Sequence, residues 1–224
     1  MTERTVIVLG AGGGLGRAVT ERFRDDGASV LAFDARIPAA GERQDQVEYV
    51  AVDALDETSV SAAFARVPSA AAVVNLIGGY PPPQGLAMLD IGVLRQQFEL
   101  NLVSAAIVTK YAMPLLAARG GGAIVHVSSR VALEKWETAF SYSVSKLGVV
   151  RLVEAAAVEG REDGVRVNCI LPSIIDTPAN RAAIPQAKYE RWPKPAELAA
   201  VLAFLISDDA ALISGAAIPV YGRA

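Results

Sequence analysis

Tyr142 and Lys146 are the two residues whose types and spacing could do chemistry together. They lie four positions apart in a segment that predicts the first turns of a helix, so their side chains would rise on one face. A free tyrosine has a pKa of about 10, and a lysine cation within a few ångströms favours the phenolate and would lower that pKa. The pair is therefore predicted to exchange a proton with a substrate. Taken alone, Tyr-x-x-x-Lys is also compatible with an ordinary surface helix.

Ser129 gives this pair a third polar group. It lies thirteen residues before Tyr142, at the end of the apolar run AIVHVSS. That run predicts a strand, which would place the Ser129 hydroxyl near the oxygen that gains or loses the proton.

Length and composition predict one α/β domain spanning residues 1–224. The chain is 52% apolar and 20% charged, and it contains 19 glycines. Its net charge of −3 provides no basic field for nucleic acid or anionic lipid, so neither partner is expected.

The single cysteine and the single histidine predict no metal site and no disulfide. Cys169 lies in the apolar run VRVNCILP and is expected to be a buried thiol, and His126 has no neighbouring ligand residues. The apolar part of MTERTVIVLG is too short for a secretory signal, and no uninterrupted apolar run reaches the roughly 18 residues of a membrane helix. A cytoplasmic protein is expected.

Short β-branched runs alternate with longer helical patterns along the chain. This alternation predicts a doubly wound, Rossmann-like α/β fold, with a mostly parallel seven-stranded sheet flanked by helices. The predicted strands are TVIVLG, SVLAFD, VEYVAVD, AAVVNLIG, GAIVHVSS, VRVNCILP and AAIPV; the predicted helices span 14–26, 58–66, 90–118, 141–159 and 196–206.

A glycine cluster between the first strand and the first helix predicts a dinucleotide site. Its spacing fits G-x-x-x-G-x-G at Gly10, Gly14 and Gly16, with Gly13 and Leu15 in the same turn. Glycine lets backbone amides approach a pyrophosphate, which the positive end of the helix dipole favours.

Two carboxylates predict the adenosine half of this site. Asp34 ends the second strand, where it could accept hydrogen bonds from both ribose hydroxyls and repel a 2′-phosphate. This favours NAD over NADP, although Arg17 and Arg36 lie near enough to accommodate a phosphate. Asp53, at the end of the third strand, could bond the adenine edge or have an ordinary strand-end or helix-capping role.

From Thr5 to about Tyr221 the chain resembles the short-chain dehydrogenase/reductase family. The glycine motif, the strand motif Asn75-Leu76-Ile77-Gly78, the helix residue Asn101 and the set Ser129, Tyr142 and Lys146 occur in the family's order. The sequence departs from the family's usual pattern at Leu9, at Leu76 and at Pro172-Ser173, which affects support of the cofactor more than the chemistry.

The resemblance implies an NAD(P)-dependent oxidoreductase that transfers a hydride between cofactor and a carbonyl or alcohol. Tyr142 would be the general acid or base, and Lys146 would lower its pKa and bond the nicotinamide ribose. Ser129 would orient the substrate oxygen, and Asn101 would hold a water in a proton relay. Further cofactor positions implied by the resemblance are Asn75, Gly78, Pro172, Ile175 and Thr177.

The run LPSIIDTPANRAAIPQAKYERWPKP also resembles quinonoid dihydropteridine reductases. Reduction of a quinonoid substrate is therefore an alternative, and a non-catalytic dinucleotide sensor is another. Substrate contacts are expected from Tyr80, Trp136 and Trp192, although each could equally be loop packing. The apolar faces of the 90–118 and 141–159 helices predict a homodimer or homotetramer.

Overall fold

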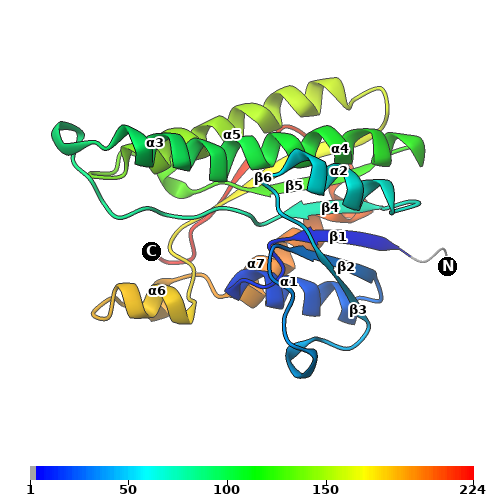
Figure 1. Ribbon diagram of the computed structural model, residues 1–224, viewed down its shortest axis with the longest axis horizontal. Coiled ribbons are helices and arrows are strands. Elements are labelled where there is room, and N and C mark those ends of the chain that lie inside the picture. The colour runs from blue at the N-terminus through cyan, green and yellow to red at the C-terminus, as the bar shows by residue number, and fades with distance from the viewer. Residues whose placement is uncertain (1–3) are drawn as a thin grey trace.

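The computed structural model describes residues 4–224, which form one seven-stranded sheet between two layers of helices (Figure 1). Every neighbouring pair of strands in it is parallel, in the order β3-β2-β1-β4-β5-β6-β7. This confirms the predicted Rossmann-like sheet. The strands are β1 (Thr5–Leu9), β2 (Ser29–Asp34), β3 (Val47–Ala51), β4 (Ala72–Asn75), β5 (Gly122–Val127), β6 (Val165–Pro172) and β7 (Ala217–Val220).

Helices connect most successive strands, and β2 is joined to β3 by a loop with a single 3-10 turn. The helices are α1 (Gly14–Asp25), α2 (Glu57–Ala65), α3 (Ile91–Phe98), α4 (Ser104–Ala118), α5 (Phe140–Glu159), α6 (Pro178–Ala183) and α7 (Pro195–Ile206). A π-helical segment, Glu99–Val103, joins α3 to α4. Short 3-10 turns occur at Ala40–Glu42, Leu86–Met88, Arg130–Ala132, Tyr189–Arg191 and Asp208–Ala210.

The sheet is buried on both faces because its central strands are continuously apolar. Helices α2, α4 and α5 cover one face, while α1 and α7 cover the other (Figure 1). In β1, Ile7 and Leu9 point into the first layer of core residues, and Val6 and Val8 point into the second. Parallel strands covered on both sides need such unbroken β-branched runs.

Two helical features differ from the expected pattern. The segment 90–118 is helical as predicted, but it contains the π-helical segment. Helix α6 was not predicted, although its signals are present: Thr177 caps it, accepting a hydrogen bond from the Asn180 N–H at 3.3 Å, and Pro178 occupies its first turn.

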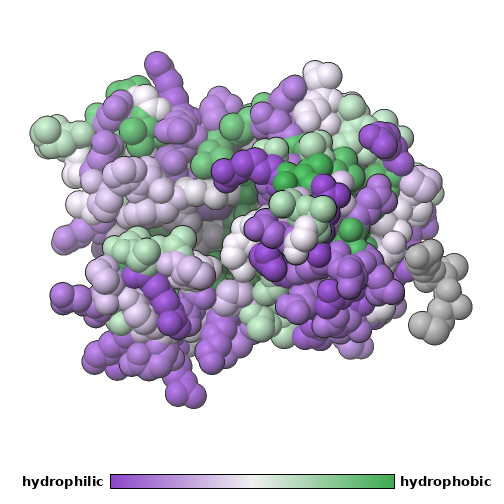
Figure 2. All heavy atoms as spheres, turned by 60° about the horizontal axis from the view of Figure 1, so that its bottom comes forward, coloured by the Kyte–Doolittle hydropathy of each residue, from purple (hydrophilic) through white to green (hydrophobic). Residues whose placement is uncertain are grey.

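The continuous helix Ile91–Ala118 is long and apolar enough to cross a membrane by length and composition alone. Its inner face, however, packs Val108, Ala112 and Leu116 into the core of this fold. The face of the molecule in Figure 2 carries mainly hydrophilic side chains, with smaller hydrophobic areas among them.

The strand order reverses direction between β1 and β4, and this reversal determines where a ligand could bind. From β1 the chain proceeds outward to β2 and β3, and it then returns to β4 on the other side of β1. The loops after β1 and β4 therefore separate at the carboxyl edge of the sheet, which is the position of ligand crevices in open α/β sheets.

Candidate active site

Tyr142 and Lys146 lie on the first two turns of α5, as the sequence predicts. The Lys146 side chain is buried, and its Nζ lies 5.9 Å from the centroid of the Tyr142 ring. The same Nζ donates a hydrogen bond of 2.9 Å to the carbonyl oxygen of Val127, the last residue of β5. The ammonium is thus held between the tyrosine and the carboxyl end of the central sheet.

The pKa values of this pair are set mainly by burial. Burial lowers the pKa of Lys146 from 10.5 to about 8. Burial also raises the pKa of Tyr142, an effect that the Ser129 hydroxyl opposes and the nearby Tyr80 hydroxyl reinforces. The sequence predicted the opposite direction for Tyr142. The difference arises because loss of water around the phenol outweighs the other influences on it.

Ser129 follows β5 in extended conformation, and its side chain lies at the Tyr142 phenol. Its neighbour Ser128 has a different position: the Ser128 hydroxyl donates a 2.8 Å hydrogen bond to the carbonyl oxygen of Lys146. Ser128 therefore fastens the strand end to α5, while Ser129 remains directed at the phenol.

Asn101 lies within the π-helical segment and is almost fully buried. Its Oδ1 accepts the Gly79 N–H at 3.0 Å, and its Nδ2 lies 2.9 Å from Oε1 of Gln97 and 3.1 Å from Oγ of Ser145. Single π-helical turns occur frequently at functional sites. Gln97 was missed from the sequence, although a polar residue four positions before Asn101 is a detectable helical signal.

Gly78 lies where Lys146 and Asn101 meet. A Cβ atom built on Gly78 would lie 2.6 Å from Lys146 Nζ and 2.7 Å from Asn101 Oδ1. Both polar side chains therefore lie against the Gly78 backbone, and any side chain at this position would displace them. The turn after β4 thus brings α5 and the π-helical segment together, as predicted from residues far apart in the chain.

The glycine turn follows β1, whereas Gly78 follows β4. The two turns therefore lie on either side of the point where the strand order reverses. Gly10 has φ +79°, and a Cβ on Gly16 would overlap the Gly10 carbonyl oxygen, so neither position admits a side chain without rearrangement. Gly13 caps α1 without any side-chain hydrogen bond, and the first turn contains no acidic residue. The backbone amides of the first turn, including those near Leu15, can therefore donate to an acceptor from outside the helix.

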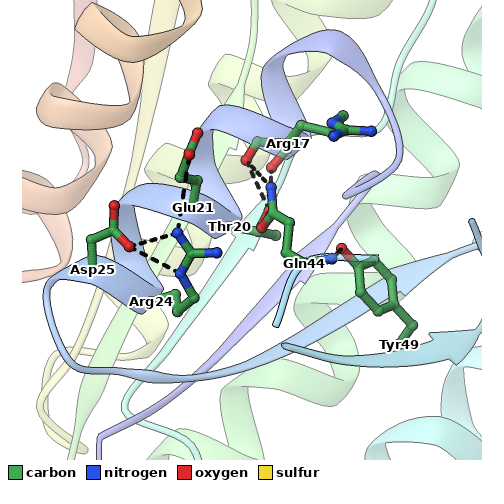
Figure 3. Close-up of polar contacts among 8 residues, drawn as sticks. Arg17, Thr20, Glu21, Arg24, Asp25, Gln44 and Tyr49 are labelled. Carbon is green, nitrogen blue, oxygen red and sulfur yellow. Dashed lines mark hydrogen bonds and ion pairs between the residues drawn. The ribbon is translucent and has the colours of Figure 1, made fainter. Parts of the chain in front are cut away.

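Asp34 lies beside the glycine turn at the end of β2. Its Oδ2 accepts the Gly12 N–H at 2.9 Å, and its Oδ1 accepts the Arg36 N–H at 3.0 Å. The following loop is tied to α1 by Gln44, whose Nε2 donates to the Arg17 carbonyl at 2.9 Å and whose Oε1 accepts from the Thr20 hydroxyl (Figure 3). Asp34 is thereby held at the rim of the turn.

Asp53 lies at the same edge, beyond β3. Its Oδ1 accepts the Leu55 N–H at 2.9 Å, and its own N–H donates to the Ser59 hydroxyl at 3.0 Å. The structure thus shows the strand-end role that the sequence left open, whereas the cap of α2 is Asp56. A contact with adenine stays a prediction.

The segment after β6 covers the glycine turn. Thr177 Cγ2 lies 3.0 Å from where a Cβ on Gly14 would be, and Thr177 also caps α6. The Ile175 carbonyl accepts from Asn180 Nδ2 at 2.8 Å, and Pro172 is the buried last residue of β6. Thr177 therefore lies against the glycine turn, whereas cofactor contacts by Pro172 and Ile175 stay predictions.

The three predicted substrate residues have different surroundings. Tyr80 packs on Tyr142, with ring centroids 4.9 Å apart. Trp136, 54% exposed, lines a cavity of about 510 Å³ between the 84–86 segment and residues 131–143. Trp192 is buried and packs edge-on against Tyr189, with centroids 5.0 Å apart. The structure brings Tyr80 to Tyr142 and does not bring Trp192 to it, so a substrate contact by Trp192 stays a prediction.

A second cavity, of about 520 Å³, lies at the opposite edge of the sheet. Two of its arginines are engaged at the end of α7: Arg4 donates to the Ile206 carbonyl, and Arg166 donates to the carbonyls of Leu205 and Ser207. These guanidinium groups offset the negative end of the helix, which explains their clustering. Within residues 4–224, no group of three or more His, Cys, Asp or Glu side chains is placed to hold a metal.

These residues fit a dinucleotide. The glycine turn leaves space that Cβ atoms would fill, the start of α1 offers amides without a side-chain cap, and Asp34 provides a carboxylate at the rim. Beyond the turn, Gly78 lies against Lys146, whose ammonium is next to the Tyr142 ring. The arrangement can hold a phosphate-linked ligand at one end and manage a proton at the other.

The similarity to known proteins extends over nearly the whole chain. The family model described as Enoyl-(Acyl carrier protein) reductase matches residues 10–222. Cis-4-hydroxycyclohexanecarboxylate dehydrogenase of Sinomonas cyclohexanicum is 34% identical, over 98% of this chain and 96% of its own length. A short-chain type dehydrogenase/reductase from Mycobacterium ulcerans is 28% identical with a TM-score of 0.92, and the match covers 98% of this chain and 89% of that one. The 3-ketoacyl-(acyl-carrier-protein) reductase of Brucella melitensis, complexed with NADH, is 28% identical with a TM-score of 0.86, covering 98% of both chains.

Proposed function

We propose, because this chain belongs to the short-chain dehydrogenase/reductase family, that it is an oxidoreductase that interconverts an alcohol and a carbonyl compound with a nicotinamide cofactor. The observation that carries this proposal is the convergence of Lys146 and Asn101 on Gly78, with Tyr142 and Ser129 beside them. Four polar side chains from three segments meet at the carboxyl edge of the sheet, next to a turn suited to pyrophosphate.

Tyr142 holds the proton in this mechanism. When bound, the cofactor supplies or accepts the hydride. Tyr142 gives its phenolic proton to the substrate oxygen in reduction and takes it back in oxidation, while Ser129 orients that oxygen by a hydrogen bond. Lys146, with a pKa lowered to about 8 by burial, provides a charge that stabilises the phenolate whenever Tyr142 has lost its proton. Asn101 holds the Gly79 backbone and, with a water, would extend the proton path to Lys146.

The cofactor would lie across the reversal between β1 and β4. Amides of the glycine turn, Gly10 to Gly16, would bind the pyrophosphate, Asp34 the adenosine ribose, and Asp53 the adenine edge. Residues on the nicotinamide side would be Asn75, Gly78, Pro172, Ile175 and Thr177. Asp34 favours NAD over NADP, because its carboxylate repels a 2′-phosphate.

The substrate class that fits best is a small cyclic secondary alcohol and its ketone. Tyr80 provides a flat apolar surface next to Tyr142, Trp136 lines a cavity beside the segment that leads into α5, and the related Sinomonas protein is named for a hydroxycyclohexane substrate. Ser129 supports this class, because a carbonyl oxygen that must be polarised needs a second donor beside the phenol.

We also propose a cytoplasmic homodimer or homotetramer that acts on neither nucleic acid nor membrane. The net charge of −3 supports the first exclusion. Leu147 and Val158 of α5 are 37% and 64% exposed, and a second copy would cover such apolar positions.

The test is a substrate panel followed by the change in NADH absorbance. It includes cyclohexanol, cis-4-hydroxycyclohexanecarboxylate, their ketones, a quinone and quinonoid dihydropterin. The wild-type protein is expected to turn over a cyclic alcohol. Tyr142→Phe should lower kcat by roughly 10² to 10⁴ and keep cofactor affinity within a few-fold. Preferential turnover of quinonoid dihydropterin would instead support the resemblance of the 171–195 segment to dihydropteridine reductases. Cofactor binding without any turnover would favour the dinucleotide sensor.

A further inference from the structure

A buried chain of hydrogen bonds runs beneath the candidate site, through the only histidine of the sequence. The Ile77 N–H donates to Asn75 Oδ1 at 3.1 Å, and Asn75 Nδ2 lies 3.2 Å from His126 Nδ1. On the other side of the ring, His126 Nε2 lies 3.0 Å from Thr109 Oγ1, which donates to the Ala105 carbonyl at 2.8 Å. This chain of hydrogen bonds crosses from β4 through β5 to α4.

The two backbone groups at its ends fix the direction of every bond between them. An amide N–H can only donate, so Asn75 Oδ1 is an acceptor and Asn75 must turn its NH₂ group to His126. Nδ1 of the ring is therefore an acceptor and carries no proton. A carbonyl can only accept, so the Thr109 proton goes to Ala105, and the Thr109 oxygen is free to accept the proton on His126 Nε2. All four bonds are satisfied only by the neutral Nε2–H tautomer.

The surroundings of His126 exclude the charged form as well. The side chain is 1% exposed, and burial together with the nearby Lys146 charge lowers its pKa from 6.5 to about 4. Cys169 of β6 pairs in register with His126 and is also buried. Lys146 and Cys169 are the titratable groups that face His126 in the described part of the chain. Neither is a carboxylate that would stabilise an imidazolium.

The hydrogen-bond chain ends at the turn after β4, and the candidate site is built on this turn. Ile77 directly precedes Gly78, which lies against Lys146 Nζ and Asn101 Oδ1, and Asn75 is two positions before Ile77. The next amide, Gly79 N–H, holds Asn101. A shift of the Asn75 amide would break its bond to Ile77 and release the turn that spaces these two side chains.

The geometry points to His126 as a positioning residue: through its neutral Nε2–H tautomer it fixes the Asn75 amide, and hence the turn that places Lys146 and Asn101. Its kinetic consequence rests on the proposed function, whereas the tautomer itself does not. The two parts are therefore tested separately.

The tautomer is measured by long-range ¹H–¹⁵N correlation on the full-length protein labelled with ¹⁵N-histidine. Because the chain has one histidine, its ring signals need no assignment. An unprotonated Nδ1 and a protonated Nε2, unchanged between about pH 8 and pH 5, are expected. A proton on Nδ1, or titration near the ordinary histidine pKa of about 6.5, would overturn the inference. The result depends neither on the folding of a variant nor on turnover.

The positioning role is measured with His126→Leu and His126→Asn. Leucine leaves the Asn75 NH₂ group without an acceptor, whereas the asparagine carbonyl can replace Nδ1. The leucine variant should lose about tenfold or more in kcat, with the KM for the alcohol nearly unchanged, and asparagine should restore most of that loss. Wild-type kcat in the leucine variant, or an equal loss in both variants, would overturn the role.

Cys169→Ala is the matched control for disturbing this part of the sheet. It shortens a fully buried side chain in the strand next to His126 without touching the hydrogen-bond chain. It should lower the melting temperature but leave kcat unchanged, so a loss of kcat in the control equal to that of His126→Leu would assign the effect to packing and reject the role. If no substrate is turned over, cofactor dissociation constants of the same variants replace kcat, and the tautomer result stands independently.

Discussion

The ring of Tyr80 packs edge-on against the ring of Tyr142, with centroids 4.9 Å apart and planes inclined by 76°. Tyr80 is half exposed and begins a loop stiffened by Pro81, Pro82 and Pro83. That loop is fastened to the segment before α5, because the Gln84 N–H donates to the Thr138 carbonyl at 2.9 Å. A substrate that reaches the phenol must therefore pass or contact the Tyr80 ring.

Tyr80→Ala should weaken substrate binding and leave cofactor binding unchanged. Loss of roughly 20–60 Å² of apolar contact with the ring costs about 0.5–1.5 kcal/mol, so the KM for a cyclic alcohol should rise roughly two- to tenfold, with kcat nearly constant. Tyr80→Phe keeps the ring and is the matched control, with wild-type KM expected. Steady-state kinetics of both variants provide the measurement, and a similar rise in the KM for the cofactor would contradict the assignment.

Gly78→Ala should impair turnover more than folding. The added Cβ would lie 2.6 Å from Lys146 Nζ and 2.7 Å from Asn101 Oδ1, and both atoms are already held by other hydrogen bonds. Displacement of these groups by a fraction of an ångström is expected to lower kcat by roughly 10- to 100-fold. Gly85→Ala, whose Cβ would meet no atom within 4 Å, is the control in the same loop. Wild-type kcat in Gly78→Ala would show that the contact is unimportant.

The fold could be predicted because its strands and helices repeat local patterns. The run VIVL followed by a glycine cluster and an amphipathic helix specifies a parallel βα unit from sequence alone. The same reasoning places Ser129 at the end of a strand and Tyr142 at the start of the helix that follows it, whereas Asn101 was identified from the family resemblance.

The environment of the candidate site could not be predicted in the same way. The direction of the Tyr142 pKa shift depends on how completely the phenol is buried, which depends on a loop more than fifty residues away. The partners of His126 are 51 and 17 positions away in sequence, on β4 and α4. The packing of Trp192 on Tyr189 had no signal in the sequence pattern either. Such relations emerge only from tertiary packing.

Asp34 should determine the choice of cofactor. Its carboxylate lies at the glycine turn, where the 2′ position of an adenosine ribose would be, and two unit charges about 4 Å apart repel by roughly 1–4 kcal/mol. The wild-type protein should therefore bind NADH more tightly than NADPH. Asp34→Ser should improve NADPH binding by at least about tenfold, since Arg17 and Arg36 are then free to attract the phosphate.

Fluorescence titration with each cofactor measures this preference. Glu48→Gln removes one exposed negative charge from the neighbouring strand β3 and controls for net charge. Tighter binding of NADPH than of NADH by the wild-type protein would contradict the role of Asp34, as would an equal gain in both variants.

The stability of the fold should fall in mild acid because of His126. Its pKa is lowered by burial from 6.5 to about 4, so as pH falls through 6.5 the unfolded chain takes up a proton that the native state refuses. Linkage then lowers the free energy of unfolding between pH 6.5 and pH 4, by about 3 kcal/mol in total and about 2 kcal/mol by pH 5. His126→Asn cannot titrate in this range, and carboxylates shared by both proteins cancel in the comparison. Urea denaturation at pH 7.5, 6 and 5 provides the measurement. Below pH 6.5 the free energy of unfolding of the wild-type protein should fall by about 1.4 kcal/mol per pH unit more than that of the variant. Parallel decreases in the two proteins would mean that native His126 takes up its proton at the same pH as the unfolded chain, which contradicts the buried, neutral ring.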